Sequence, residues 1–289
     1  MRIVIIGAAG QLGTDLQKVL SEWELVPLTH ADLDICDFNR TRAAVSDTKP
    51  DAVINTAAFN RVDDCEDCPE QAFAVNAFGP RHLAQICAEL KCVLMHISTD
   101  YVFGGEKQIP YREDDTPNPL SVYGVSKLAG ESFVRHNCPK HYVVRTSGLY
   151  GVAGSRSKGG NFVETMIHLA REGKSIRVVN DQVLSPTFTR DLAEKLKELL
   201  QTGKYGVYHL TNSGQCSWYE FASTIFDLAG LKPDFGPATS VEYKAKARRP
   251  AYSVLANANI KHVGIQDARG WRAALSAYLA ERKLHPLCH

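Results

Sequence analysis

The sequence predicts an α/β protein with a Rossmann-type, doubly wound parallel sheet and a smaller α/β lobe in its C-terminal half. Two observations carry this prediction. Short apolar segments alternate with helical segments through the first half of the chain, which is the pattern of βαβ units. The first apolar segment, residues 2–6, also runs directly into a glycine-rich turn that precedes a helix. We expect a Rossmann domain over residues 1–150 and a mainly substrate-binding lobe over residues 151–289, with some segments of the lobe returning to the first sheet.

The strands of the first half are expected at short apolar segments rich in β-branched residues: 2–6, 24–28, 52–55, 93–98 and 142–146. Helices are expected between them, at 14–20, 38–48, 69–90 and 123–137, the third with Pro69 at its start. The pattern changes after residue 150. Residues 151–160 are rich in glycine, serine and charge and predict a mobile surface loop, and helices follow at 161–172, 189–200, 218–228 and 271–282, with a strand at 176–179.

The composition excludes several classes of protein. The chain of 289 residues carries 33 basic and 32 acidic residues, so it has no excess charge with which to bind nucleic acid or an acidic membrane. No apolar run approaches the ~20 residues of a membrane-spanning helix, and the N-terminus enters a strand at once, unlike a signal peptide. Cys65 and Cys68 have no second pair to complete a four-ligand site. We therefore expect a cytoplasmic protein without metal or disulfide.

The glycine-rich turn predicts a dinucleotide site. Gly7, Gly10 and Gly13 lie between the first strand and the first helix, where glycines let the backbone turn tightly and approach a pyrophosphate. The helix N-terminus behind them offers free N–H groups and the positive end of the helix dipole. The second glycine stands one place later than in the commonest pattern.

The choice between NAD and NADP stays open. An acid after the second strand favours NAD and an arginine favours NADP; this region contains Asp32 and no arginine. Asp32 could be that acid or a capping residue of the loop. Asp37 and Phe38 could flank the adenine, or they could be a helix N-cap and a core side chain.

A tyrosine and a lysine four residues apart predict proton-transfer chemistry. Tyr123 and Lys127 lie on one face of the expected helix and can serve the same bound molecule. The ammonium should favour the phenolate and lower the pKa of the phenol, which is normally ~10. Ser98 and Thr99, at the carboxyl end of a strand, are both candidates for a hydroxyl that donates to a substrate carbonyl oxygen beside Tyr123.

These motifs occur in the order found in the extended short-chain dehydrogenase/reductases, and the chain resembles that family along essentially its whole length. The shared motifs are the glycine turn, residues 55–58, residues 75–79, residues 98–104 and the helix of Tyr123 and Lys127. More narrowly, the chain resembles the dTDP-4-dehydrorhamnose reductases, on matches at residues 145–151, 160–162, 181–187 and 249–255.

The resemblance implies reduction of the C4 ketone of dTDP-4-dehydro-6-deoxy-L-mannose to dTDP-L-rhamnose by NADPH or NADH, in a possible homodimer. It implies that Tyr123 gives the proton, that Lys127 lowers its pKa and holds the nicotinamide ribose, that Thr99 polarises the carbonyl, and that Asn76 supports the proton relay. The implied cofactor contacts are Gly7, Gly10, Gln11, Leu12, Gly13, Asp37, Phe38, Ala57, Ala58, Tyr123 and Lys127. The implied substrate contacts are Thr99, Asp100, Tyr101, Asn161 and Arg249. Arg249 belongs to a basic cluster that could bind the diphosphate or could be a solvated loop.

Two departures from the family pattern and three alternatives remain. Gly148 stands where many members have a tryptophan that packs on the sugar, so the pocket should be roomier there. Some relatives bind magnesium through acidic side chains. Asp15 could correspond to one of these acids, but Arg190 occupies the position where another acid is expected, so we predict no metal. A 4,6-dehydratase would need a glutamate where Tyr101 follows Asp100. A 4-epimerase uses the same Tyr and Lys, and a noncatalytic subunit resembling the regulatory subunit of methionine adenosyltransferase can keep them, so both stay open.

Overall fold

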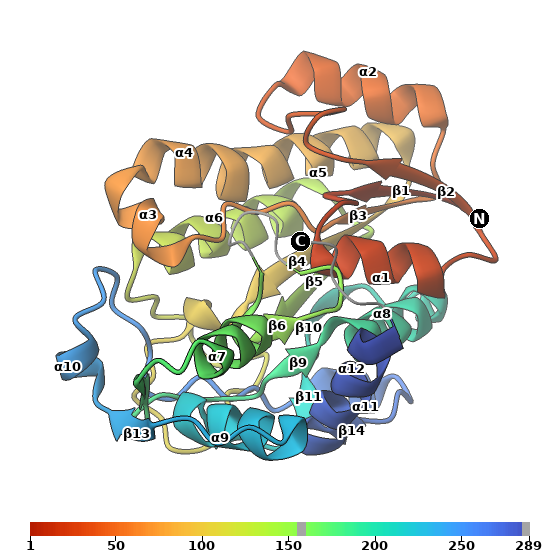
Figure 1. Ribbon diagram of the computed structural model, residues 1–289. Helices are drawn as coiled ribbons and strands as arrows, with labels where there is room; N and C mark the ends of the chain where they lie inside the picture. The colour runs from red at the N-terminus through yellow and green to blue at the C-terminus, as the bar shows by residue number, and fades with distance from the viewer. Residues whose placement is uncertain (155–159, 285–289) are drawn as a thin grey trace.

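A six-stranded sheet, parallel throughout, forms the centre of the computed structural model, which describes residues 1–154 and 160–284. The strand order is β10-β5-β4-β3-β1-β2, with helices on both faces (Figure 1). The predicted fold class is confirmed. The elements up to residue 150 are β1 (Arg2–Ile6), α1 (Gln11–Val19), β2 (Glu24–Leu28), α2 (Phe38–Thr48), β3 (Ala52–Asn55), α3 (Val62–Asp67), α4 (Pro69–Phe73), the π-helical turn η1 (Ala74–Phe78), α5 (Gly79–Leu90), β4 (Val93–Thr99), the 3-10 turn η2 (Asp100–Val102), α6 (Val122–Asn137), β5 (His141–Thr146) and β6 (Leu149–Tyr150).

The second half of the chain contributes to the first sheet and also builds a separate layer. Strand β10 pairs in parallel with β5, and helix α8 packs beside α1. The elements are α7 (Phe162–Arg171), β7 (Ile176–Val179), β8 (Val183–Leu184), β9 (Thr187–Phe188), α8 (Thr189–Thr202), β10 (Gly206–His209), β11 (Asn212–Ser213), β12 (Cys216–Ser217), α9 (Trp218–Ala229), β13 (Phe235–Ala238), α10 (Ser240–Tyr243), α11 (Ala258–His262), β14 (Ala268–Gly270) and α12 (Trp271–Leu284). Of the loop predicted over 151–160, residues 155–159 lie outside the described residues.

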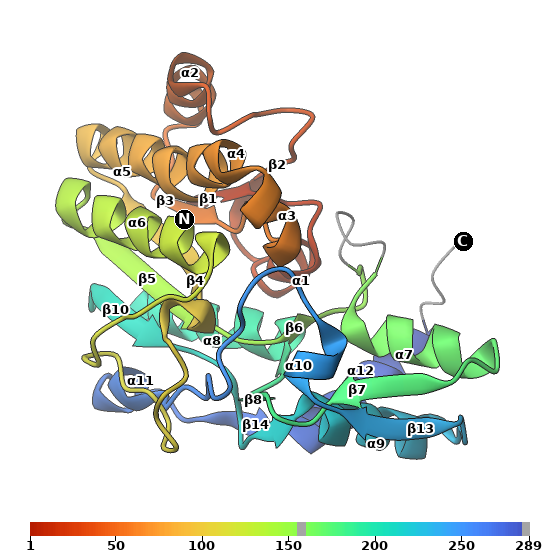
Figure 2. The same ribbon diagram turned by 90° about the vertical axis from the view of Figure 1, so that its left-hand side faces the viewer.

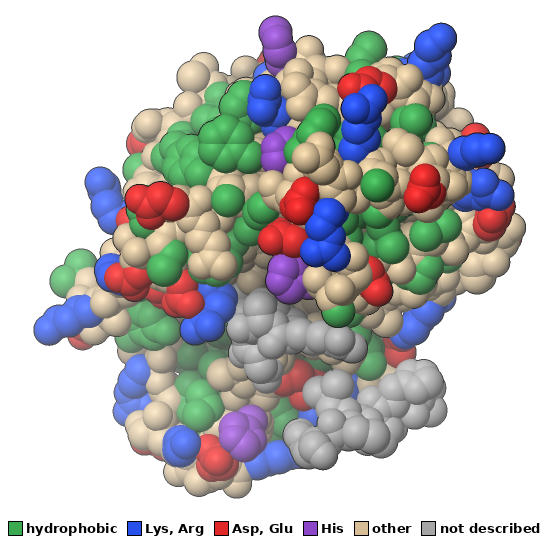
Figure 3. Space-filling model, turned by 90° about the horizontal axis from the view of Figure 1, so that it is seen from above, with side chains coloured by type: hydrophobic (Ala, Val, Ile, Leu, Met, Phe, Trp, Pro, Cys, Tyr) green, Lys and Arg blue, Asp and Glu red, His purple; other side chains and the backbone are tan. Residues whose placement is uncertain are grey.

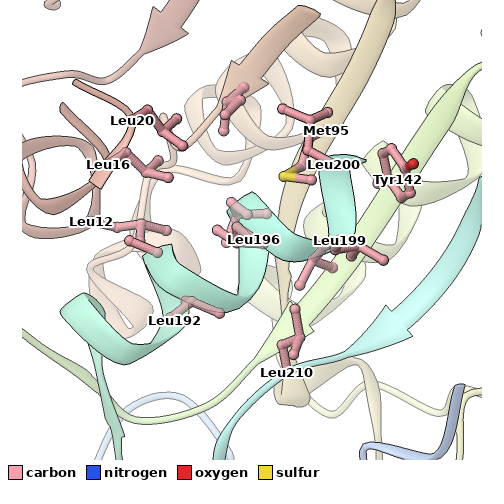
Figure 4. Packing of buried hydrophobic residues seen from close by; sticks show 14 of the residues in the cluster. Leu12, Leu16, Leu20, Met95, Tyr142, Leu192, Leu196, Leu199, Leu200 and Leu210 are labelled. Atoms are coloured by element: carbon pink, nitrogen blue, oxygen red, sulfur yellow. The ribbon is translucent and has the colours of Figure 1, made fainter. Parts of the chain in front are cut away.

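Alternate residues of the strands separate the two faces of the sheet. Ile3 and Ile5 of β1 pack into the cluster on the side of α1 and α8, whereas Val4 and Ile6 pack into the cluster on the side of α2 and α5. Figure 4 shows the first cluster, in which leucines of α1 and α8 lie against side chains of the strands such as Met95. Both faces are covered, which explains why the strands read as continuous apolar runs.

A third cluster forms the core of the second lobe. It joins α7, α9 and α12 through fully buried side chains that include Phe221, Ala274 and Tyr278, and all its buried members lie between residues 150 and 279. The lobe lies beside the carboxyl edge of the sheet (Figures 1 and 2). The division into a Rossmann domain and a substrate-binding lobe stays a proposal, which this separate core supports.

The helix predicted from Pro69 through residue 90 is interrupted by η1, and here the prediction was wrong. Pro80 lies in the first turn of α5 and has no N–H to donate to the carbonyl of Asn76, four residues earlier. The carbonyl of Asn76 instead lies against Gly130 of α6, at the place that a Cβ atom would occupy. A proline and a close helix contact therefore turn one stretch of the helix into the wider π form.

Charges of both signs are interspersed on the helical face seen from above (Figure 3). One ion pair on these helices joins Arg42 of α2 to Glu89 near the end of α5, at 3.0 Å. None of the helices in the described part of the chain is both long enough and apolar enough to span a membrane.

Candidate active site

A cavity of about 490 Å³ lies between the carboxyl edge of the sheet and the second lobe. The sheet side contributes Thr99, Asp100 and Tyr123, and the lobe contributes Phe162 and Trp218, among others. Open α/β sheets bind their ligands at this edge. The cavity is therefore the candidate active site.

The glycine turn beside this cavity fits a dinucleotide. Gly7 has φ +78°, and a Cβ atom there would lie 2.7 Å from Oγ1 of Thr56 and 2.9 Å from the backbone nitrogen of Ala57. At Gly13 a Cβ atom would lie 2.5 Å from the carbonyl oxygen of Gly7. Gly10 caps α1 without a side chain that could occupy the free N–H groups. The backbone is thus open to a pyrophosphate at the helix N-terminus.

The other predicted cofactor residues divide into two groups. Gln11 lines the cavity; its Nε2 donates to the carbonyl of Leu149 (3.2 Å), while its buried Oε1 has no partner among the described residues. Ala57 and Ala58 follow β3 at the same sheet edge and are half-buried. Leu12 is a core side chain, 4% exposed, so only its backbone can face a cofactor.

Three residues near the expected adenine position, Asp32, Asp37 and Phe38, contact other residues of the protein. The carboxylate of Asp37 accepts from the backbone N–H of Arg40 (3.0 Å) and caps α2, and Phe38 packs edge-on against His82. Asp32 accepts from the backbone and the hydroxyl of Thr29. The capping alternatives for Asp37 and Asp32 are thus what the structure shows, and the choice between NAD and NADP stays open.

Tyr123 and Thr99 come together as predicted, and their side chains are hydrogen-bonded. The ring of Tyr101 stands edge-on to Tyr123 at 5.9 Å between centroids. Burial raises the pKa of Tyr123, and the hydrogen bond with Thr99 only partly opposes this. The predicted lowering of this pKa by Lys127 was therefore wrong, because the lost hydration of the phenolate dominates. The amine of Lys127 instead donates to the carbonyl oxygen of Ile97 (2.7 Å).

The two neighbouring hydroxyls, both candidates from the sequence, have different partners. Ser98 Oγ donates to Glu131 (2.5 Å), which also binds Arg145 in a fully buried ion pair (2.7 Å). Thr99 Oγ1 accepts from the backbone nitrogen of Tyr101 (3.2 Å) and meets Tyr123. The structure therefore favours Thr99 as the hydroxyl that faces a substrate carbonyl.

Asp100 is a buried carboxylate in the wall of the cavity. It accepts hydrogen bonds from Ser253 (2.6 Å), Ser147 (2.8 Å) and Thr99 (3.1 Å). Burial raises the pKa of Asp100 to about 6, even though the three hydroxyls stabilise its charged form. The group thus titrates near neutral pH.

Asn76 is fully buried and lies in the turn η1. Its amide accepts from the backbone N–H of Phe59 (2.9 Å) and donates to the carbonyl of Phe59 (3.0 Å) and to Ser126 Oγ (3.1 Å). Since Ser126 precedes Lys127, these bonds fix the part of α6 that carries the lysine. Asn76 is therefore placed to position this helix.

Arg249 lines the cavity and ties the second lobe to α3. Its guanidinium holds both carboxylate oxygens of Asp63 (3.1 and 2.8 Å), and it also hydrogen-bonds the Tyr101 phenol. The neighbouring Lys246 forms an ion pair with Asp67 of the same helix. Figure 2 shows this segment rising from α10 toward α3. The basic cluster is thus at least partly anchored and is more than a solvated loop.

Asn161 lines the cavity but is also a structural residue. Its Oδ1 caps α7 by accepting from the N–H of Glu164 (3.1 Å), and its Nδ2 donates to the carbonyl of Gly151 (3.0 Å) and to the Tyr278 hydroxyl (3.2 Å).

Asp15, the acid that could correspond to a magnesium ligand of some relatives, accepts from the hydroxyl of Thr189 (2.5 Å). No cluster of acids, histidines and cysteines suited to a metal ion occurs in residues 1–154 and 160–284.

Gly148 has φ +55°, and a Cβ atom there would lie 2.8 Å from Leu184 and 3.2 Å from Pro186. A tryptophan would need a strained backbone and a different packing of this loop.

Sequence reasoning missed several cavity residues, including Thr146, Gln182, Leu184, Phe162, Trp218 and Tyr243. Phe162, Gln182 and Leu184 lie within the matched segments 160–162 and 181–187, whereas Trp218 and Tyr243 had no signal. Thr146 lies within the matched segment 145–151 and ends the strand beside β4, in register with Thr99. Its buried hydroxyl has no partner among the described residues.

A Rossmann-type sheet, a glycine turn shaped for a pyrophosphate, and a Tyr–Thr–Lys set at the carboxyl edge define a dinucleotide-dependent reductase of the extended short-chain type. The sequence model of the RmlD substrate binding domain matches residues 1–284. The chain therefore belongs to this family, that of the dTDP-4-dehydrorhamnose reductases, and the predicted resemblance is confirmed.

Known relatives align along nearly the whole chain. The spore coat polysaccharide biosynthesis protein SpsK of Bacillus subtilis is 42% identical, over 97% of this chain and 98% of that protein. A dTDP-4-dehydrorhamnose reductase of Streptomyces griseus is 42% identical, over 95% of this chain and 92% of that protein. The structure of dTDP-4-dehydrorhamnose reductase from Bacillus anthracis in complex with NADP has a TM-score of 0.92 at 38% identity, covering 97% and 99% of the two chains. A dTDP-4-keto-6-deoxy-D-glucose reductase of Streptomyces niveus is 37% identical, over 95% of each chain.

Proposed function

We propose that this protein reduces the C4 ketone of dTDP-4-dehydro-6-deoxy-L-mannose to dTDP-L-rhamnose with NADPH or NADH. The single observation that carries the proposal is the hydrogen-bonded pair of Thr99 and Tyr123 in a cavity next to the glycine turn. The names of the relatives in the same family support the sugar and the coenzyme.

The cofactor would be held by the backbone of Gly7, Gly10 and Gly13 and, at its nicotinamide end, by Tyr123 and Lys127. When bound, it supplies a hydride for C4 of the sugar. Thr99 and Tyr123 hold the ketone oxygen with two hydroxyl groups and stabilise the charge that develops on it. Tyr123 then gives its proton to this oxygen.

The raised pKa of Tyr123 suits this direction of reaction. A phenol that is protonated throughout the neutral range is ready to donate, whereas the reverse oxidation needs a phenolate.

The position of Arg249 supports the binding of a sugar nucleotide in the cavity. Arg249 presents a guanidinium at the cavity wall that can bind a diphosphate, once the bond to Asp63 is shared or exchanged.

A second candidate function is the reduction of a different dTDP-4-keto sugar. Gly148 leaves the cavity without the tryptophan that many members place on the sugar, and at least one family relative is named for such a substrate. A 4,6-dehydratase is disfavoured, because Tyr101 stands where that reaction needs a glutamate. The 4-epimerase and the noncatalytic subunit are separated from a reductase by net turnover of NAD(P)H.

The test is NADPH and NADH oxidation by the purified chain, with dTDP-4-dehydrorhamnose and dTDP-4-keto-6-deoxy-D-glucose as separate substrates and the products identified. We expect oxidation with the first sugar, yielding dTDP-rhamnose, and a loss of ~10²–10⁴-fold in kcat in Tyr123→Phe. Faster turnover of the second sugar would select the second candidate, and near-normal turnover by Tyr123→Phe would contradict the mechanism. The cytoplasmic location and the possible homodimer stay predictions.

A further inference from the structure

The amine of Lys127 has a buried neighbour that the proposed chemistry does not use. His96 is 0% exposed and lies on β4, and its Nε2 stands 3.5 Å from Nζ of Lys127. On the neighbouring strand β3, Asn55 is the register partner of His96 and is also fully buried. These three side chains form a line from β3 through β4 to α6.

The hydrogen bonds along this line fix which nitrogen of the imidazole carries the proton. The backbone N–H of Ala57 donates to Oδ1 of Asn55 (3.1 Å), so Nδ2 is the atom that faces Nδ1 of His96 (3.1 Å). An amide nitrogen can only donate, so Nδ1 of His96 is an acceptor. The neutral imidazole therefore carries its proton on Nε2, the atom that faces Lys127.

An N–H that points at an ammonium places two donors against each other, whereas the lone pair of a neutral amine can accept from it. The carbonyl of Ile97 accepts from Lys127 in either state, at 2.7 Å. A charged His96 would keep its proton on Nε2 and so would not relieve the conflict, and burial and the nearby lysine also lower the pKa of His96 well below the ordinary value. The contact thus favours the amine over the ammonium.

The surroundings of Lys127 point in the same direction. Burial lowers the pKa of Lys127 to about 8, and the charge of Glu131 on the same helix opposes this only in part. Glu131 is itself paired with Arg145. The titratable and charged groups around the Tyr–Lys pair are His96 from β4, Tyr123 and Glu131 from α6, Arg145 from β5, Asp100 and Tyr101 from η2, and Cys65 from α3.

We propose that His96 is a positioning residue of the reduction, which turns Nε2–H toward Lys127 and favours the neutral amine that forms once Lys127 has replaced the proton given away by Tyr123. This inference rests on the proposed function. In that replacement an N–H bond of Lys127 breaks and the O–H bond of Tyr123 forms again, and water returns a proton to the amine afterwards. Asn55 acts on Lys127 only through His96, by donating to Nδ1 and so holding the imidazole in the tautomer with its proton on Nε2.

The first test compares His96→Gln with a matched control, His209→Gln. The glutamine at 96 can turn its amide oxygen toward the ammonium, whereas His209 is an equally buried imidazole that bonds the carbonyl of Tyr111. The profile of kcat/KM against pH reports the groups of the free enzyme, so its alkaline limb should follow the loss of the charged Lys127. We expect His96→Gln to move this limb upward by about one pH unit, and His209→Gln to leave it in place. A loss of rate at every pH with an unmoved limb in His96→Gln would overturn the inference.

The second test needs no turnover. Nitrogen NMR of the protein labelled with ¹⁵N-histidine distinguishes the two neutral tautomers, and the signal of His96 is identified by its absence in His96→Gln. We expect a neutral ring with its proton on Nε2 across the range from pH 6 to 9 at which the spectra are recorded, and a ring protonated on Nδ1 would overturn the inference. A wild-type protein that reduces no dTDP-keto sugar would refute the proposed function instead, and the tautomer would still be measured.

Discussion

The neighbouring hydroxyls of Ser98 and Thr99 allow one substitution to test catalysis and the other to test stability. Thr99→Val keeps the shape of the side chain and removes the hydroxyl that meets Tyr123. Loss of one such preorganised donor costs ~10²–10³-fold in kcat, or ~3–4 kcal/mol of transition-state stabilisation. The backbone N–H of Tyr101 also loses its acceptor, which costs about 1–3 kcal/mol of folding stability. Asp100 keeps its bonds from Ser147 and Ser253.

Ser98→Ala is the matched control, since it removes a buried hydroxyl one residue away. Its bond to the carboxylate of Glu131 is short, at 2.5 Å, and the loss of a hydrogen bond to a charged group costs about 1.5–3 kcal/mol. Glu131 keeps its pair with Arg145, so the fold should survive and kcat should change no more than a few-fold. The two variants should therefore separate, with Thr99→Val losing turnover and Ser98→Ala losing stability.

The assay is initial-rate kinetics with dTDP-4-dehydrorhamnose, together with urea unfolding of each variant at the assay pH. Thr99→Ser should recover most of the lost kcat, because it restores a hydroxyl at the same atom. If Ser98→Ala lost as much kcat as Thr99→Val while remaining folded, the assignment of the carbonyl contact to Thr99 would be refuted.

Three further predictions follow from the same structure. Arg249→Ala should raise KM for the dTDP-sugar at least ~10-fold with a smaller effect on kcat, because a diphosphate contact is lost; an unchanged KM would contradict the role. Gly13→Ala places a Cβ atom 2.5 Å from the carbonyl of Gly7 and should weaken NADPH binding, measured by fluorescence titration, far more than Gly10→Ala, where the same distance is 3.3 Å; equal effects would refute the argument. The pKa of Asp100 is raised in the folded protein to about 6 from 3.8, so its stabilising contribution is present below pH 3.8 and is lost as the pH rises through 6. The unfolding free energy of wild type should therefore fall by about 3 kcal/mol relative to Asp100→Asn over this window; a difference that does not change with pH would show that the carboxyl is not perturbed.

The parts of the site that the sequence predicted are those that depend on local geometry. Tyr123 and Lys127 share a helix face because of the helical period, and the glycines are spaced by the turn that they make. The ends of β3, β4 and β5 meet at one edge because the strands are parallel, which places Thr99 and Asp100 in the cavity. In each case the pattern of a few neighbouring residues determines the position.

The parts that could not be predicted depend on contacts between distant segments. The raised pKa of Tyr123 follows from its burial among Thr99 of β4, Tyr101 of η2 and Cys65 of α3, which no local pattern encodes. The turn η1 depends on the close approach of the Asn76 carbonyl to Gly130, and the Asn76 side chain bonds Phe59 and Ser126, which lie 17 and 50 residues away. Arg249 could not be placed from its basic neighbours, because its partner Asp63 lies 186 residues away along the chain.

The arrangement of α6 on β4 explains why neighbouring residues have such different tasks. Tyr123, Lys127 and Glu131 succeed each other at four-residue intervals and lie along β4, so one stripe of the helix meets the strand from its end inward. The even-numbered His96 and Ser98 face this stripe, whereas Met95 and Ile97 pack into the cluster on the other side of the sheet. Ser98 therefore bonds Glu131 in the buried part of the fold. Thr99 is the last residue of β4 and bonds the phenol of Tyr123 at the edge of the sheet.

The ion pair of Glu131 with Arg145 fixes the inner end of this stripe. Both groups are almost completely buried, and removing one partner of such a pair costs ~3–5 kcal/mol, because the other charge is left without compensation. Since Tyr123 lies two turns further along the same helix, the distance between its phenol and Thr99 depends on how firmly this pair holds α6 against β4 and β5. A pair that does not line the cavity thus helps to position the tyrosine that we propose as the proton donor.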